Sequence, residues 1–277
     1  MPFLTNETDS QLVDIYFKDY GSGQPVILIH GWPLSHQAWE QQIWAVVEAG
    51  YRCIAYDRRG FGNSDAPWDG YDYSTLASDV HEIIEQLDLE DVILVGFSMG
   101  GGEVVRYCTD YGTDTLSKVA LVSSIIPLVA QKEDNPNGVP QKDLDGIIKA
   151  LQEDRVGFLK DFHKNFYNYE DHKDTISEAQ LHYDWSIASH ASPRATIQAA
   201  KSWAETDFRP ELKNVTVPCL IVHGDADNIV PKATSADQAA EGIPNNRYEV
   251  LSNGPHGLNL THKHELNTLL IDFFNES

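Results

Sequence analysis

Short, continuously apolar segments recur along the chain, and several are rich in β-branched residues. They lie at residues 25–29, 53–56, 92–95, 119–122, 218–222 and 248–251. Continuous apolar runs are typical of strands that helices cover on both faces. Residues 13–17 instead alternate between apolar and polar positions, and a Gly-Ser-Gly turn follows them. This second pattern predicts a strand that pairs antiparallel with the next one along the chain.

Helical periodicity lies between these runs. Apolar residues recur every three to four positions over residues 76–87, with Asp72 or Ser74 as the candidate N-cap, and a shorter stripe covers residues 104–108. Strand and helix patterns thus alternate over residues 25–125. The rules for chain connections then favour a mostly parallel α/β sheet.

The alternation stops in the second half of the chain. Residues 131–143 are polar and contain two prolines, which predicts an exposed loop. An apolar stripe at helical spacing then runs over residues 147–166, and aromatic-rich helical stretches continue to residue 205. The sheet pattern resumes after them. We therefore expect a single domain over residues 1–277, with a helical cap at about residues 128–212 inserted into one sheet.

Composition argues against several classes of partner. Lys and Arg number 20 and Asp and Glu number 42, so the formal net charge is −22. Such a chain repels phosphate backbones and anionic lipids, which argues against nucleic-acid and membrane partners. No apolar run approaches the roughly 18 residues of a membrane span, and residues 1–7 do not resemble a secretory signal. The three cysteines lie in apolar patterns without CxxC spacing, so we expect buried, reduced thiols in a cytoplasmic protein.

A glycine-flanked serine directly follows one of the apolar runs. Residues 96–100 read Gly-Phe-Ser-Met-Gly, two more glycines follow, and a helical stretch begins there. A serine on a tight strand-to-helix turn needs small neighbours, which give the backbone clearance. The phosphate-binding patterns G-x-x-x-x-G-K-[ST] and G-x-G-x-x-G do not occur. Ser98 is therefore a candidate nucleophile.

A serine hydroxyl needs a positioned base. In hydrolases built on such a turn, the acid and the base follow the serine on loops after late strands. His256 lies on a glycine- and proline-bounded loop just after the run at 248–251, which makes it the candidate base among eleven histidines. Asp225 and Asp227 follow the preceding run, and either can supply the carboxylate that orients the imidazole. Spacing alone does not choose between them.

Acyl transfer also needs backbone N–H groups that stabilise the developing oxyanion. Met99, the residue after the candidate nucleophile, supplies one. The loop at residues 30–33 supplies the other, and because Pro33 has no N–H, Trp32 is the candidate donor. We expect Trp32 and Phe97, together with aromatic residues of the cap, to line an apolar substrate pocket.

Three basic residues near these motifs allow more than one interpretation. His30 begins the loop of Trp32, and the pair Arg58 and Arg59 follows the run at 53–56. Paired arginines can form an anion site, and His30 could be a catalytic residue. In a chain this acidic we interpret all three residues as braces for loops.

Together these residues resemble the α/β-hydrolases, and within them the cofactor-free haloperoxidases, or perhydrolases, with their esterase and γ-lactamase relatives. The similarity covers nearly the whole chain, and its most specific part is residues 96–107. The resemblance implies an α/β-hydrolase fold, with a mostly parallel eight-stranded sheet flanked by helices and a small helical cap. It also implies a catalytic triad and two oxyanion donors without a metal or other cofactor, and homo-oligomers such as trimers or hexamers. The triad is Ser98, Asp227 and His256, and the donors are Trp32 and Met99.

The resemblance further implies a carboxylic ester hydrolase that works through an acyl-enzyme. Hydrogen peroxide is then an alternative acyl acceptor, which turns the product into a peracid. A γ-lactamase or amide hydrolase with the same triad is one alternative, and a non-catalytic homologue that binds a ligand is another. Haloalkane dehalogenases and epoxide hydrolases share the fold but need an aspartate at the turn, and Ser98 argues against them.

Overall fold

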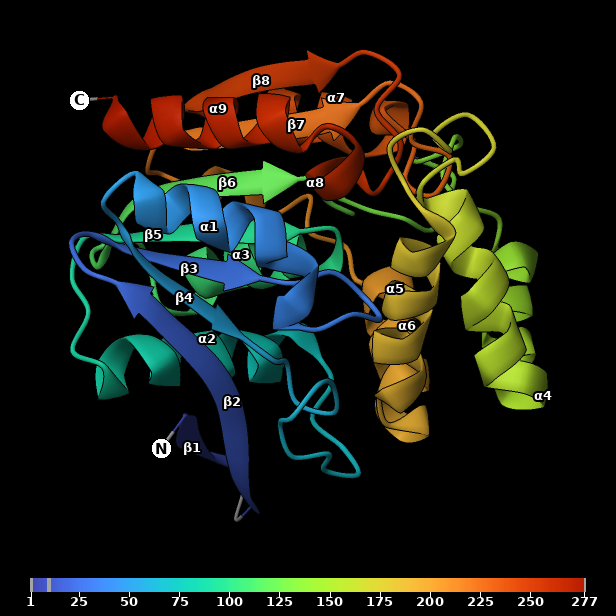
Figure 1. Ribbon diagram of the computed structural model, residues 1–277, viewed down its shortest axis with the longest axis horizontal. Helices are drawn as coiled ribbons and strands as arrows, with labels where there is room; N and C mark the ends of the chain where they lie inside the picture. The colour runs from blue at the N-terminus through green and yellow to red at the C-terminus, as the bar shows by residue number, and fades with distance from the viewer. Residues whose placement is uncertain (1, 9–10, 277) are drawn as a thin grey trace.

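The computed structural model describes residues 2–8 and 11–276. They form one eight-stranded sheet that helices cover (Figure 1). The strand order is β1-β2-β4-β3-β5-β6-β7-β8. β2 pairs antiparallel with β1 and β4, and the other neighbours are parallel. The expected eight-stranded, mostly parallel sheet is therefore confirmed. Its strands are β1 (Phe3–Thr8), β2 (Gln11–Gly21), β3 (Pro25–Ile29), β4 (Arg52–Tyr56), β5 (Val92–Phe97), β6 (Leu116–Val122), β7 (Cys219–Gly224) and β8 (Asn246–Leu251).

The predicted partner of β2 is wrong. The Gly-Ser-Gly turn leads from β2 into β3, but β4 lies between these two strands and bonds to both. Gly21 and Gly23 have positive φ angles, and a Cβ atom on either would collide with the backbone carbonyl of Tyr51 or Gly50. The glycines thus make room for the chain that enters β4, instead of closing a hairpin.

Two helical layers cover the sheet (Figure 1). On one face α1 (Glu40–Glu48) packs against α9 (Lys263–Asn275), and on the other α2 (Tyr73–Gln86) packs against α3 (Met99–Asp110). The strands β3, β5 and β7 are buried along their whole length. Burial on both faces explains why their sequences are continuously apolar. The short helical elements are α7 (Ala236–Gly242), α8 (Leu258–Thr261), η1 (His36–Trp39), η2 (Leu212–Asn214) and η3 (Lys232–Thr234).

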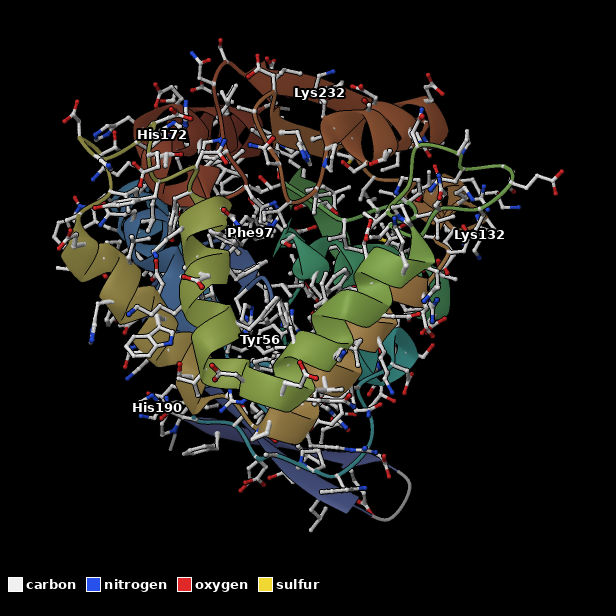
Figure 2. All side chains as sticks on the ribbon, turned by 90° about the vertical axis from the view of Figure 1, so that its right-hand side faces the viewer. Tyr56, Phe97, Lys132, His172, His190 and Lys232 are labelled. Atoms are coloured by element: carbon white, nitrogen blue, oxygen red, sulfur yellow. The ribbon has the colours of Figure 1, made fainter. Side chains whose placement is uncertain are left out.

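Three helices between β6 and β7 lie over the carboxyl ends of the parallel strands. They are α4 (Gln141–Phe166), α5 (Glu178–His190) and α6 (Pro193–Glu205), and α4 packs against the other two. α4 bends at Asp154, which has non-helical angles of φ −150° and ψ 77°. Figure 2 shows the two halves of α4 as the arms of a V, with Phe97 of β5 behind them. These helices place a wall opposite the ends of β5, β6 and β7.

Two further predictions concern membrane-spanning helices and the state of the cysteines. No helix within them has the length and apolar character that crossing a bilayer requires. Cys53, Cys108 and Cys219 are buried and form no disulfide. Burial raises the pKa of Cys53 and of Cys108 to about 12, so both remain neutral thiols at pH 7. The prediction of buried thiols is confirmed.

Candidate active site

Ser98 occupies a sharp turn between β5 and α3. Its backbone angles are φ 53° and ψ −116°, in a region that non-glycine residues rarely adopt. The turn also forces close backbone contacts. A Cβ on Gly96 would lie 2.5 Å from the carbonyl oxygen of Gly100, and a Cβ on Gly100 would lie 2.5 Å from that of Ile29. Glycine at both positions therefore allows the strained turn that holds the Ser98 hydroxyl at the edge of the sheet.

Side chains from three loops meet at this turn. His256 Nε2 lies 2.9 Å from Ser98 Oγ, and His256 Nδ1 lies 2.7 Å from Asp227 Oδ2. Burial alone would raise the pKa of Asp227, but the positive charge that His256 carries when it is protonated, together with hydrogen bonds from His223 and His256, holds this pKa well below its usual range. A carboxylate only accepts hydrogen bonds, so Nδ1 carries the proton and Nε2 accepts the Ser98 hydroxyl.

The two aspartates that the sequence left as alternatives have different neighbours. Asp227 is buried, and its Oδ1 accepts the backbone N–H groups of Ile229 and Val230 at 2.9 and 2.8 Å. Asp225 is exposed at the turn, where its Oδ1 accepts the N–H of Asn253 at 2.6 Å. The hydrogen bonds of Asp225 therefore hold the turn, whereas Asp227 faces the imidazole.

His223 also belongs to this cluster, although the sequence does not single it out. It lies at the end of β7, and its Nε2 is 3.1 Å from Asp227 Oδ2 and 2.8 Å from the carbonyl oxygen of Val230. A carbonyl only accepts, so Nε2 carries a proton and points it toward both oxygens. The spacing of four residues between His223 and Asp227 was the available signal, but a pair that joins a strand end to the loop after it has no fixed geometry.

The loop of Trp32 packs directly on the serine turn. The N–H of Leu34 donates to the carbonyl of Gly31 at 3.0 Å, a turn that does not use the N–H of Trp32. A Cβ on Gly31 would lie 2.9 Å from the ring of Phe97 and 3.1 Å from Ser98 Cβ. Met99 begins α3, so its N–H belongs to the first helical turn, whose donors lack partners within the helix. Both candidate oxyanion donors thus adjoin Ser98 in the fold.

Buried ion pairs hold the loops beneath this turn. Arg58 donates to the carbonyl of His30 at 2.6 Å and to Glu103 of α3 at 2.6 Å. The backbone N–H of Arg58 donates to His30 Nε2 at 3.0 Å. Burial and the charge of Arg58 lower the pKa of His30 to about 3, so the ring is neutral. Arg59 pairs with Asp79 at 2.6 Å. These contacts confirm the interpretation of the three basic residues as braces.

An apolar cavity of about 310 Å³ opens beside Ser98, and we call it the inner cavity. The polar residues in its wall are Ser98, His256 and Asn228. Within residues 2–8 and 11–276, no cluster of three or more His, Cys, Asp or Glu side chains has the arrangement of a metal site. The cap supplies much of the wall through Leu144 and through side chains of its apolar stripe or its aromatic set: Ile147, Phe158, Phe162 and Trp203.

Of the two residues expected to line the pocket, the structure places one in the wall and the other behind it. Trp32 lines the inner cavity, and its indole N–H donates to the carbonyl of Thr196 at 2.9 Å. Phe97 is fully buried and is not in the wall. Its ring lies 5.5 Å from the ring of His256 and 5.8 Å from that of Trp39. The turn directs the side chain before Ser98 into the core, where it supports the imidazole from behind.

Comparison with known proteins defines the class. The model of the alpha/beta hydrolase fold family matches residues 24–263, and the chain belongs to this family. A non-heme chloroperoxidase from Kitasatospora aureofaciens is 38% identical over 100% of both chains. A bifunctional esterase/perhydrolase from Acinetobacter calcoaceticus is 35% identical over 94% of this chain and 96% of that relative. The crystal structure of a bromoperoxidase from Bacillus anthracis has 44% identity and a TM-score of 0.95, over 99% of this chain and 100% of that one.

These similarities confirm the resemblance that the motifs indicated. The chain is an alpha/beta hydrolase enzyme, and its relatives include non-heme haloperoxidases and an esterase/perhydrolase. The family match rests on nearly the whole chain and not on the serine motif alone. The fold and the class of enzyme are therefore established together.

Proposed function

We propose that this enzyme hydrolyses carboxylic esters with Ser98 as nucleophile, His256 as general base and Asp227 as the acid that orients the imidazole. One observation carries the proposal. His256 lies 2.9 Å from Ser98 Oγ on one side and 2.7 Å from Asp227 on the other, in the wall of an apolar cavity. This is the geometry that acyl transfer by an activated serine requires. The esterase among the relatives supports an ester as the substrate.

In the first half of the reaction, Ser98 Oγ attacks the ester carbonyl while His256 Nε2 takes the hydroxyl proton. The N–H groups of Trp32 and Met99 donate to the oxyanion of the tetrahedral intermediate. Asp227 stays ionised and stabilises the imidazolium. The intermediate then collapses, the C–O bond to the alcohol breaks, and His256 gives its proton to the departing oxygen. An acyl group remains on Ser98.

In the second half, a water molecule loses a proton to His256 and attacks the acyl carbonyl. Collapse returns the proton to Ser98 Oγ and releases a carboxylic acid. When hydrogen peroxide takes the place of water, the same steps release a peracid, RC(O)OOH, and regenerate the serine. A peracid oxidises halide ions in solution. This reaction links the haloperoxidase and perhydrolase names among the relatives to one acyl-enzyme.

The inner cavity favours uncharged esters of small to medium size. Its volume is about 310 Å³, and apolar side chains from the cap and from the loop after β7 form most of its wall. A charged group in such a wall would lose its hydration without gaining a partner. Apolar acyl and alcohol groups, in contrast, gain from burial there.

Ser98→Ala tests the proposal. Loss of the nucleophile is expected to lower kcat for p-nitrophenyl acetate by a factor on the order of 10⁶. A serine-directed phosphonate should label the wild-type enzyme at Ser98, as mass spectrometry of peptides would show. Ser252→Ala, at an exposed serine on the loop before His256, is the matched control and should retain activity.

Substantial turnover by Ser98→Ala, or phosphonate labelling at another residue, would contradict the mechanism. Both variants are first compared with the wild type by circular dichroism, so that misfolding is recognised. Preference of the wild-type enzyme for a bicyclic γ-lactam over the aryl ester, with the same dependence on Ser98, would favour the amide-hydrolase alternative.

A further inference from the structure

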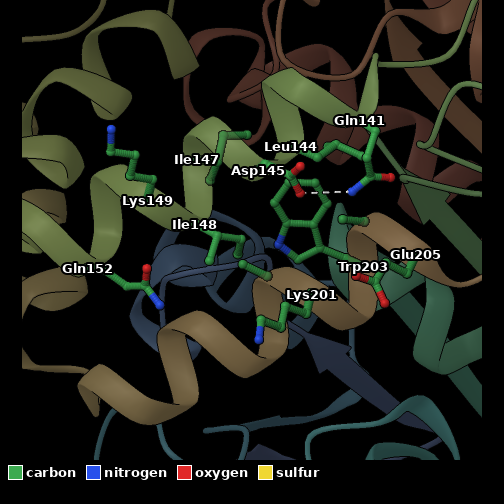
Figure 3. A pocket seen from close by; sticks show the side chains of 12 residues that line it. Gln141, Leu144, Asp145, Ile147, Ile148, Lys149, Gln152, Lys201, Trp203 and Glu205 are labelled. Carbon is green, nitrogen blue, oxygen red and sulfur yellow. Dashed lines mark hydrogen bonds between the residues drawn. The ribbon is translucent and has the colours of Figure 1, made fainter.

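A second cavity lies on the far side of Trp203, and we call it the outer cavity. Its volume is about 160 Å³, and it lies between α4 and α6. Figure 3 shows the indole of Trp203 between these helices, with Leu144 and Ile147 of α4 above it and Lys201 of α6 below it. The exposed residues of the outer cavity are charged or carry amides, whereas Ala200 and Ala204 are buried at its floor.

The two cavities share a wall. Trp203, Leu144 and Ile147 line both of them, and Trp203 is the largest of the three side chains. The Trp203 ring packs edge-to-face on Trp32, with the ring centroids 5.9 Å apart. The indole therefore separates the space beside Ser98 from the space between the two cap helices.

No hydrogen bond fixes the Trp203 indole. Its Nε1 is buried and has no hydrogen-bond partner among the residues that the structure describes. The indole N–H of Trp32, in contrast, donates to a carbonyl. Replacing Trp203 therefore leaves no buried protein acceptor without its donor, so the effect of a substitution reports on volume and packing.

We propose that Trp203 is the end wall of the substrate cavity and sets the chain length of the esters that the enzyme accepts. The outer cavity is then a second subsite, closed off by the indole, for the far end of a medium-length aliphatic chain. This inference rests on the proposed ester hydrolysis at Ser98. Each CH₂ group that moves from water into contact with apolar side chains strengthens binding about fourfold. A CH₂ group that the indole keeps out of the outer cavity gains no such contact and adds no affinity.

The experiment compares Trp203→Ala with Trp203→Phe, which keeps an aromatic ring in the wall. kcat/KM is measured for p-nitrophenyl esters from acetate to octanoate, and for acetates of linear alcohols from ethanol to octanol, because either end of the substrate can face Trp203. The ratio of the longest to the shortest substrate is taken within each variant, so a general loss of activity cancels. Trp203→Ala is expected to raise this ratio at least about tenfold in one of the two series, and Trp203→Phe much less.

A double variant provides the reversal. Ile148 lines the outer cavity but not the inner one. Adding Ile148→Phe to Trp203→Ala refills the outer cavity and should return the ratio toward the wild-type value. If Trp203→Ala does not fold by circular dichroism, Trp203→Leu makes the same comparison with an apolar side chain retained.

The outcomes separate this inference from the proposed function. If the enzyme hydrolyses acetate through Ser98 but the ratio is unchanged in both series, Trp203 does not set chain length and the ester mechanism stands. If the wild type hydrolyses no ester, or if Ser98→Ala retains its activity, the proposed function itself is wrong. A raised ratio that the double variant does not reverse would assign the effect to loosened packing and would overturn the second subsite.

Discussion

At the scale of single residues, the Asp227 carboxylate has more hydrogen-bond partners than the other carboxylate near Ser98, that of Asp225. It accepts two backbone N–H groups through one oxygen and lies within hydrogen-bonding distance of two histidines through the other. Such bonding favours the ionised form, which is why its pKa lies well below the usual range despite burial. The same bonds fix the direction of the oxygen that faces His256.

Asp227→Asn should therefore lower kcat for p-nitrophenyl acetate by about 10⁴, with little change in fold. The amide can present N–H groups to His256 Nδ1, which forces the proton onto Nε2 and removes the acceptor for the Ser98 hydroxyl. Asp225→Asn is the matched control, because an asparagine oxygen can still accept the N–H of Asn253. A loss of kcat as large in Asp225→Asn as in Asp227→Asn, with both proteins folded, would show that the turn and not the carboxylate is what matters.

The residues around Ser98 differ in how well the sequence could predict them. The motif and the chain order single out Ser98 and His256, because both lie next to predicted strands. Asp225 and Asp227 share one turn, so their separation depends on backbone angles that spacing does not determine. The place of Phe97 behind the pocket depends on the strained turn at the next residue, which reverses the direction of the side chains.

At the scale of elements, the cap was predictable as helical, but its shape was not. The apolar stripe of α4 is continuous, so periodicity gives no reason for a bend. The bend occurs where Asp154 Oδ1 accepts the N–H of Gly157 at 2.9 Å, which caps the second half of the helix. The position of β4 between β2 and β3 was also not predictable from local patterns, because strand order depends on contacts between segments far apart in the chain.

A buried acid joins two of the cap helices. Tyr167, which follows α4, donates to Asp184 of α5 at 2.6 Å, and Gln180 donates to the other oxygen at 3.0 Å. The Tyr167 ring lies against Gly257, where a Cβ would collide with it, beside His256. Burial raises the pKa of Asp184 to about 6, because the two hydrogen bonds only partly offset the lost hydration. This acid therefore titrates in the folded cap at a mildly acidic pH.

Because the pKa of Asp184 differs between the folded and the unfolded chain, the free energy of unfolding depends on pH. An aspartate in the unfolded chain titrates near 3.9, so between about pH 4 and pH 6 the folded protein retains a proton that the unfolded chain has lost. The contribution of Asp184 to the free energy of unfolding is therefore largest below about pH 4 and falls as the pH rises through about 6. Asp184→Asn keeps an acceptor for Tyr167 without this titration. Its free energy of unfolding should equal that of the wild type near pH 4 and exceed it by on the order of 2 kcal/mol above pH 6.

Urea unfolding at a series of pH values measures this difference. Asp174→Asn is the control, because this aspartate of the same cap is exposed and should give no pH-dependent difference. If Asp184→Asn lowers the free energy of unfolding equally at every pH, hydrogen-bond geometry and not charge determines the role of Asp184.

At the scale of the whole molecule, most of the excess of 22 negative charges lies outside the core, although Asp57 and Asp227 are buried carboxylates that face histidines. Arg58 and Arg59 are buried in pairs with Glu103 and Asp79, and each pair is neutral as a unit. Most of the other acidic side chains are exposed or half-buried and carry the excess, whereas the wall of the inner cavity is mostly apolar. A field of one sign around the cavity lowers the local concentration of any anion that approaches it.

Two p-nitrophenyl esters of equal chain length, the neutral butyrate and the anionic succinate half-ester, separate the repulsion of anions from the rate of ester hydrolysis itself. Raising the salt concentration from about 0.01 M to about 0.1 M shortens the Debye length from about 30 Å to about 10 Å, which screens the repulsion. kcat/KM for the anionic succinate should then rise about three- to tenfold, while kcat/KM for the neutral butyrate should stay nearly constant. The butyrate series also controls for any effect of salt on stability. A succinate rate that falls with salt would instead mean that a local cation near the cavity outweighs the net charge.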